Sequence, residues 1–577
     1  MRKLTHALLA GLSVLTLVLA PAAPAFAQRK QLLEYPSIHH PTVGMKGMVV
    51  SQNEIASQVG AAILRQGGNA VDAAVAVGFA LAVTLPRAGN IGGDGFMLVH
   101  IAEPKQTVVI DFRSVAPKAA RLDMFIDARG KENVAASRGY RAVAVPGTVA
   151  GLALAQKTYG RLAWKDVVEP ARHLAADGVT LSADEAFVFG WAQERMGESA
   201  AGRAAFYKPD GSLYGAGETL RQLDLAWSLG LIAEQGPDAF YRGEIARRLA
   251  ADMKVHGGLI TMEDLAAYRP VVRAPLMGTY RGYSIATTPP ASAGGATLLE
   301  MLNILEGFDL QATGGAGSAG ALHLMSETMK MAYADRYRYL GDSDFVKMPL
   351  TGMTSKAYGA ERARQIDPTR AQPAKTLGSG DPWKFESPST THYSVADAAG
   401  NVVSTTYTLG ADFGSGVMVA GAGFVLNNQM NNFSHEAAYA AREAKTPPPP
   451  NGMMAGKRML STMMPTIVFK DDKPWLVTGS PGGSTIIDTV LQVVVNVIDF
   501  RLNVAEAVHQ PRIFQNASDR LEVEPNFNPD TLALLRARGH PVTTAETMGS
   551  AQSILIENGM FMGAADPRRP GALAVGP

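Results

Sequence analysis

The chain of 577 residues contains no cysteine. This absence excludes disulfide bonds, thiol nucleophiles and cysteine-ligated metals, and it suits an oxidising compartment because no thiol can mispair there. The net charge is close to zero, at +1 at pH 7. This value gives no indication that the protein binds a nucleic acid or an anionic membrane surface. The apolar fraction of 47% is ordinary for a globular protein. The length predicts two or more domains.

Long apolar runs are scarce, and the one that begins the chain has the features of an export signal. A positively charged start is followed by the apolar run Ala7–Ala20 and by Ala25-Phe26-Ala27, a small-x-small cleavage pattern. Residues 1–27 are therefore predicted to be a secretory signal peptide, and the protein to be periplasmic or secreted. An uncleaved anchor is the alternative, but the run is short for spanning. The apolar stretch Val75–Leu85 is interpreted as a buried helix, so no later membrane span is expected.

Capping patterns mark the first two predicted helices. Ser51 with Glu54 precedes a helix expected over about 55–66, and Asn69 with Asp72 precedes one over 71–84. The glycine-rich loop Gly89–Gly95 lies between a helix and a strand, and no Gly-Lys-Ser/Thr follows it. We therefore interpret this loop as a site of close backbone packing rather than a nucleotide loop.

Helices and strands alternate irregularly along the rest of the chain. Further helices are predicted at 149–158, 164–176, 220–235, 244–256, 297–305, 321–340, 488–499 and 529–539. Strands are predicted at 47–51, 96–101, 108–113, 423–428, 465–470, 474–478, 553–556 and 560–563, the last two around an Asn-Gly turn. This mixture indicates an α+β protein with sheets packed between helical layers.

A threonine-rich hairpin lies in the middle of the chain. Thr390–Asp397 and Val402–Leu409 have strand-like composition and flank a Gly-Asn turn, and the flexible-looking Gly378–Trp383 precedes them. A chain break in front of Thr390 would make its hydroxyl a nucleophile and its own α-amine the base. An ordinary threonine-rich hairpin is the alternative.

The hairpin also carries a family signature. Thr390-x-His392-x-Ser394-Val395, then Gly400-Asn401-x-Val403-Ser404-x-Thr406-x-Thr408-Leu409, then Phe413-Gly414, resembles the γ-glutamyltranspeptidase family of autoprocessing N-terminal-nucleophile hydrolases. The resemblance runs from about Gly47 to the C-terminus. It implies a four-layer αββα sandwich, no cofactor and no metal. It also implies self-cleavage between Ser389 and Thr390 into a large chain, 28–389, and a small chain, 390–577, that form a heterodimer.

The resemblance assigns the catalytic parts of the site. Thr408 matches the family residue that hydrogen-bonds the nucleophile, although a strand threonine without a catalytic role is the alternative. Gly482 and Gly483 match the family's oxyanion hole. Consecutive glycines before a helix suit that role because backbone N–H groups and the helix dipole can both face an anion. A plain strand-to-helix turn is the alternative.

The resemblance also assigns the groups that bind the substrate carboxylate. Arg113 ends an apolar strand, from which its planar fork could bind a carboxylate in bidentate fashion, and the family arginine here grips the glutamyl α-carboxylate. A surface salt bridge is the alternative. Ser461 and Thr462 match the family's Ser-Ser contacts to the same carboxylate, with threonine replacing the second serine.

Two positions depart from the family pattern. The family usually has Asn or Glu where this chain has Gly410, and Asp where it has Asn432, and both residues contact the substrate α-amino group. Gln429, a third contact, is present. A desolvated ammonium needs an anionic or strong acceptor partner, so we expect weakened recognition of the amine. A glutaryl group, which lacks the amine, fits the altered pocket, as in glutaryl-type cephalosporin acylases of this family.

Three functional hypotheses follow. The first is a γ-glutamyl hydrolase or transpeptidase acting on glutathione-like amides, the second a glutaryl-type acylase with the same machinery, and the third a secreted binding protein without catalysis. A metalloenzyme is disfavoured because His435-Glu436 lacks the second histidine of a zinc helix, and His39-His40 lies in a linker. We expect these histidines to be exposed. The acceptor (water or an amine), higher oligomers and a lid around Pro447–Pro450 stay open.

Overall fold

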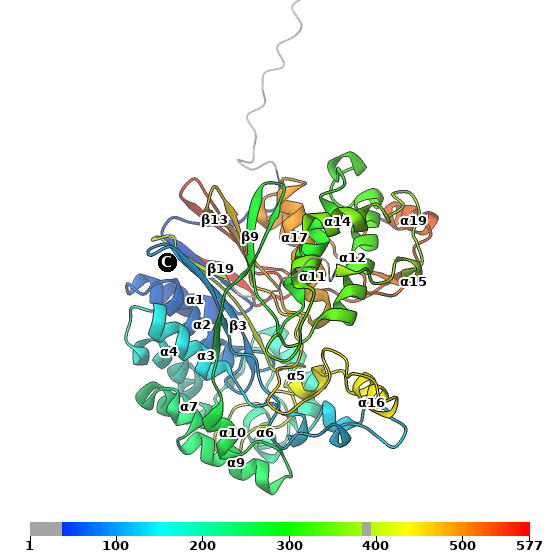
Figure 1. Cartoon of the computed structure of the whole chain (residues 1–577). Coiled ribbons are helices and arrows are strands. Elements are labelled where there is room, and N and C mark those ends of the chain that lie inside the picture. The colour runs from blue at the N-terminus through cyan, green and yellow to red at the C-terminus, as the bar shows by residue number, and fades with distance from the viewer. Residues whose placement is uncertain (1–36, 383–393) are drawn as a thin grey trace, which may run out of the picture. The chain divides into compact units, whose positions relative to one another are not determined.

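The computed structural model describes residues 37–382 and 394–577. The predicted signal peptide and the Ser389–Thr390 bond lie outside the described residues. Two seven-stranded sheets form the centre (Figure 1). The first has the order β19 (Leu573–Val575), β2 (Gly47–Ser51), β10 (Ser394–Asp397), β11 (Val402–Thr408), β3 (Asp94–Ile101), β4 (Gln106–Asp111), β7 (Val271–Arg273). The second has the order β1 (Thr42–Gly44), β18 (Met560–Ala564), β17 (Ser553–Glu557), β13 (Lys473–Thr478), β12 (Thr466–Lys470), β9 (Tyr283–Thr287), β8 (Leu276–Tyr280).

Helices cover the outer faces of both sheets. Beside the first sheet lie α1 (Glu54–Arg65), α2 (Ala70–Thr84), α3 (Thr148–Tyr159), α4 (Trp164–Asp177) and α7 (Leu223–Gln235). Beside the second lie α11 (Gly294–Leu305), α12 (Ala319–Tyr339), α14 (Lys356–Ala363), α17 (Ile486–Ile498) and α18 (Val504–His509). Helix α2 packs on β10 and β11, α11 packs on β8, and β11 contacts β13 of the other sheet. The predicted α+β, four-layer αββα sandwich is confirmed.

Burial follows the sequence pattern of each element. Helix α2 is apolar on all sides, and all of its residues are buried, because it packs against the sheet and against helices α1, α3 and α4. Helix α17 is likewise buried along its whole length. The central strands of the first sheet, β2, β10, β11 and β3, are buried nearly throughout, because helices cover one face and the second sheet covers the other.

Local capping and turn chemistry largely match the predictions. Asn69 and Asp72 form the predicted capping box of α2, and Asn558 and Gly559 both have positive φ in the tight turn between β17 and β18. The predicted cap of α1 is wrong by two residues. Its N-cap is Asn53, whose side chain accepts from the two backbone N–H groups that follow Glu54, whereas Ser51 ends β2.

The strand predicted at 423–428 is wrong. This segment makes only isolated bridges, Gly92 with Leu426 and Met418 with Val425. The segment is fastened to distant parts of the chain by the Asn427 side chain, which donates to the carbonyls of Gly92 and Ala144 at 2.9 Å. A β-rich composition was therefore overridden by side-chain hydrogen bonding. Within the described ranges, no helix has the length and apolar content needed to cross a bilayer.

Candidate active site

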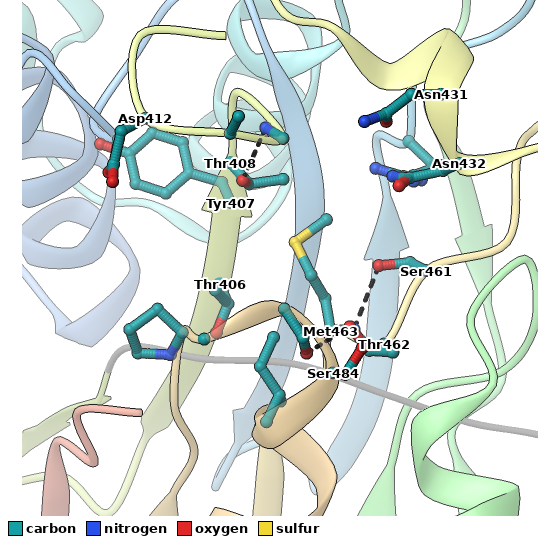
Figure 2. A pocket seen from close by; sticks show the side chains of 18 of the residues that line it. Thr406, Tyr407, Thr408, Asp412, Asn431, Asn432, Ser461, Thr462, Met463 and Ser484 are labelled. Atoms are coloured by element: carbon teal, nitrogen blue, oxygen red, sulfur yellow. Dashed lines mark hydrogen bonds between the residues drawn. The ribbon is translucent and has the colours of Figure 1, made fainter. Parts of the chain in front are cut away.

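A cavity of about 710 Å³ lies where the end of β11, the loop after β13 and the end of α12 meet. Figure 2 shows one part of it, with Thr408 on one wall and Asn432, Ser461 and Thr462 on the other. The cavity brings together most of the residues that the sequence singled out. Those lining it are Arg113, Thr408, Gly410, Asn432, Ser461, Thr462, Gly482 and Gly483. Gln429 lies behind Asn432, and Thr390 lies outside the described residues.

Arg113 follows β4 and is fully buried. Its Nη1 donates to both carboxylate oxygens of Asp94, at 2.7 and 2.9 Å, and its Nε donates to the Met459 carbonyl at 3.1 Å. Burial raises the pKa of Asp94, and the guanidinium of Arg113 opposes that rise. The sequence predicted an arginine directed into a cleft, but it did not predict this buried anionic partner, which holds the guanidinium in one orientation.

Asp94 also reaches the opposite end of the site. Its Oδ1 accepts a hydrogen bond of 3.1 Å from Gln429 Nε2, and Gln429 Oε1 accepts one from Asn432 Nδ2. Arg113, Asp94, Gln429 and Asn432 thus form one connected chain of hydrogen bonds. Asp94 ends the glycine-rich loop and begins β3, so an acidic residue at a loop–strand boundary was the signal that could have identified it.

The side of the pocket next to Asn432 carries no formal charge from the residues named there. Gln429 and Asn432 are amides, and Gly410 has no side chain. A Cβ at Gly410 would lie 2.1 Å from Asn428 Oδ1, and its φ is +100°. The backbone itself therefore disfavours a side chain at this position. Asp412 is an acidic residue of the pocket, but Figure 2 shows it beyond Thr408 on the side away from Asn432, and its Oδ1 lies 3.8 Å from Arg87 Nη1.

The Gly482–Gly483 turn lies between β13 and α17. Both residues have positive φ, at +131° and +57°, which only glycine adopts at low cost. The Thr462 hydroxyl donates to the Gly483 carbonyl at 2.8 Å. That bond ties the turn to the segment that carries Ser461. The predicted helix after the turn is separated from it by the 3₁₀ turn Gly483–Thr485.

Thr408 is the last residue of β11, and its Oγ1 accepts from the Gly410 N–H at 2.9 Å (Figure 2). The glycine-rich loop packs tightly against this strand end, since a Cβ at Gly93 would lie 2.1 Å from the Thr408 carbonyl. This confirms the interpretation of the loop as a site of close backbone packing. Thr408 is a half-buried residue at the cavity wall.

Histidine clusters away from the cavity have structural partners. His323, Glu327 and His540 could together hold a metal ion among the described residues. His323 Nδ1 and His540 Nε2 are already hydrogen-bonded at 2.7 Å, however, and Lys330 donates to Glu327 at 2.6 Å, so a cation would have to displace both. The prediction that His435 is exposed is wrong. It is buried, its Nε2 lies 2.8 Å from the Met430 carbonyl, and Phe125 stacks on it.

Comparison with known proteins supports one family. The model of the family "Gamma-glutamyltranspeptidase" matches residues 56–576. The chain is 47% identical to the glutathione hydrolase proenzyme of Escherichia coli K12, over 99% of this chain and 98% of that protein. It is 38% identical to the acylase ACY 1 proenzyme of Pseudomonas sp. SE83, over 92% of this chain and 94% of that protein. The crystal structure of cephalosporin acylase from Bacillus halodurans superposes with a TM-score of 0.83 at 30% identity, covering 95% of this chain and 98% of that one.

Proposed function

Because this chain belongs to the γ-glutamyltranspeptidase family, we propose that it cleaves γ-glutamyl amides such as glutathione through an ester on Thr390. Water or an amine then takes the acyl group. The observation that supports this substrate class is the buried Arg113–Asp94 pair, whose arginine lines the same cavity as the Gly482–Gly483 turn. An acyl group with a terminal carboxylate would bind Arg113 while its carbonyl meets the turn.

The mechanism begins with processing of the precursor. Thr390 Oγ attacks the Ser389 carbonyl, the peptide nitrogen leaves as the new α-amine, and water hydrolyses the resulting ester. This produces the large chain 28–389 and the small chain 390–577, which remain associated as a heterodimer. The freed amine has an unperturbed pKa of about 7.7–8 and can accept the Thr390 hydroxyl proton near neutral pH.

Substrate turnover uses the same groups. Thr390 Oγ attacks the substrate amide, and the N–H groups of Gly482 and Gly483 stabilise the oxyanion. Ser461 and Thr462 assist Arg113 at the carboxylate. Ser394 pairs with Ser404 in the hairpin. Thr408 lies as many residues beyond Ser404 as Thr390 lies before Ser394, and this equal spacing supports its role beside the nucleophile.

Processing is tested by replacing the nucleophile. Thr390→Ala should remain a single precursor band on a denaturing gel and should hydrolyse no γ-glutamyl anilide. The neighbouring Thr391→Ala is the matched control and should still divide into two chains. A precursor of the unaltered chain that never divides would support a binding protein without catalysis and would contradict the proposal.

A glutaryl-type acylase is the second candidate, and Gly410 with Asn432 favours it. The test compares γ-glutamyl and glutaryl 4-nitroanilides on processed protein, with and without a dipeptide acceptor. Faster γ-glutamyl turnover that rises with acceptor would identify a transpeptidase for which Gln429 and Asn432 suffice. Faster glutaryl turnover would identify an acylase.

We further propose that the protein is exported to the periplasm or secreted, with residues 1–27 removed. Mass spectrometry of the large chain purified from the native compartment tests this proposal. A chain that starts at Gln28 is expected, and one that retains Met1 would contradict it.

A further inference from the structure

The proposed acyl contacts occupy only one part of the cavity. Arg113, Ser461 and Thr462 bind the carboxylate in that proposal, and the Gly482–Gly483 turn receives the reacting carbonyl. The same cavity is also lined by Arg336 and Tyr337, near the C-terminal end of α12. Beyond the reacting carbonyl lies the amine half of an amide substrate, so this part of the cavity is where the leaving amine or the acceptor would lie.

A hydrogen bond from helix α12 to the segment after the Gly482–Gly483 turn holds Arg336 close to the proposed reaction centre. One turn before Arg336, Tyr333 donates through its hydroxyl to the Ser484 carbonyl at 2.6 Å. Ser484 directly follows the Gly482–Gly483 turn. Helix α12 therefore ends against the turn that is proposed to stabilise the oxyanion, and Arg336 lines the cavity at that point.

The guanidinium of Arg336 is held by aromatic rings rather than by carboxylates. Its Cζ lies 5.0 Å from the ring centre of Tyr337 and 5.8 Å from that of Tyr333. Its Nε is buried and has no hydrogen-bond partner among the described residues. Arg113 and Arg87, on other walls of the cavity, are each bonded to a buried carboxylate at 2.9 Å or less. Arg336 is thus a guanidinium held in position with at least one N–H donor that has no partner among the described residues.

No carboxylate of the described residues forms an ion pair with Arg336. Burial raises the pKa of Asp488 well above its usual range, and the charge of Arg336 opposes that rise. Asp412, an acid that lines the cavity, lies beside Arg87. A carboxylate is the ligand that best complements a planar guanidinium in a partly desolvated site.

We propose that Arg336 binds a carboxylate carried by the amine half of the substrate. The favoured leaving groups and acceptors are then amines that bear an acid, such as amino acids, peptides with a free C-terminus or acidic ring amines. Arg336 is a specificity-determining residue in this scheme, and Tyr337 positions it. This inference rests on the proposed amidase function, because that function defines which half of the substrate lies beyond the Gly482–Gly483 turn.

The kinetic test uses two leaving groups that differ by one carboxylate. The probes are the 4-nitroanilide and the 3-carboxy-4-nitroanilide of whichever acyl group the enzyme cleaves faster. In Arg336→Met, KM for the carboxylated anilide should rise by roughly 10- to 100-fold, since a hydrogen bond to a charged group is lost. The neutral anilide should keep its kcat and KM. Arg336→Lys keeps the positive charge but lacks the planar guanidinium. Its KM for the carboxylated anilide should lie between the values of the wild type and of Arg336→Met.

Two control variants make the result specific. Arg247→Met removes the same charge from an exposed arginine paired with Glu244 on α9 (Glu244–Val255) and should change neither anilide. Arg569 also lines the cavity and has a buried Nε without a partner in the described part of the chain. If Arg569→Met, rather than Arg336→Met, removes the preference for the carboxylated anilide, the inference is wrong.

A binding measurement separates this inference from the proposed function. Glycylglycine should raise the melting temperature of the processed wild type more than its C-terminal amide does, and Arg336→Met should abolish that difference. If the wild type hydrolyses neither anilide, the amidase function is contradicted. The difference in melting temperature between glycylglycine and its amide would still show whether Arg336 binds a carboxylate. Equal losses with both anilides, or an unchanged melting difference in Arg336→Met, would overturn the inference.

Discussion

The two ends of the proposed acyl site are built on opposite principles. At one end a buried arginine is bonded to a buried aspartate, Arg113 to Asp94. At the other end Gln429 and Asn432 present amides, and Gly410 presents only backbone. The first end can bind a carboxylate with its charge already oriented. The second can accept hydrogen bonds from an ammonium but cannot neutralise it. If the proposed contacts hold, recognition of a carboxylate and recognition of its neighbouring amine are separable properties of one pocket.

The largest loss of activity is expected from Asp94, because this residue is hydrogen-bonded to both ends of the site. Asp94→Asn removes the anionic partner of buried Arg113. Removing one partner of a buried ion pair typically lowers stability by about 3–5 kcal/mol. Because γ-glutamyl and glutaryl donors both carry the terminal carboxylate, kcat/KM should fall at least about 100-fold for both. Asp94→Glu keeps the charge and should recover part of the activity. A loss confined to the γ-glutamyl donor would show that Asp94 serves the amine end through Gln429 instead.

The next largest change in donor preference is expected when a negative charge is added at the amine end. Asn432→Asp should raise the ratio of γ-glutamyl to glutaryl kcat/KM by about 10-fold or more, because an ammonium gains an anionic partner. Asn431→Asp adds the same charge one residue away, also at the cavity wall, and is the matched control. Equal shifts in both variants would mean that the general potential of the cavity, rather than contact at 432, selects the donor.

A smaller effect tests why position 410 has no side chain. Gly410→Ala combines a positive φ with a Cβ 2.1 Å from Asn428 Oδ1, whereas Gly211→Ala has a positive φ in open space. Both should lower the free energy of unfolding, Gly410→Ala by about 1–3 kcal/mol more than the control, as measured by urea denaturation. Equal stability of the two variants would show that Asn428 can move and that Gly410 is not imposed by packing.

The smallest effect on donor choice is expected far from the pocket. Burial lowers the pKa of His540 to about 3, below its unfolded value of about 6.5. The unfolded chain therefore binds more protons between these values, and stability should fall as pH drops below about 6.5. His540→Gln should weaken this acid dependence of the melting temperature and leave the donor ratio unchanged. A changed ratio would mean that the pocket ends depend on distant packing.

Much of the fold could be predicted because its signals are local. The all-apolar run of α2 required a buried helix, and Asn558-Gly559 required a tight hairpin between β17 and β18. The segment 423–428 has strand-like residues but became a loop because the Asn427 side chain satisfies distant backbone groups. Burial of His435 likewise depends on Phe125, a neighbour far away in the chain.

The sequence by itself determined which chemical groups this protein possesses. It supplied a threonine-rich hairpin pattern, a Gly-Gly pair before a helix, an arginine after an apolar strand, and positions 410 and 432 without an acid. These are properties of residue type and spacing. Only the tertiary structure decided which charges are paired. Asp94 bonds to Arg113 and Gln429, whereas Arg336 lies against two tyrosine rings and forms no ion pair with a carboxylate of the described residues. Packing between layers brings these partners together, and no local pattern specifies it.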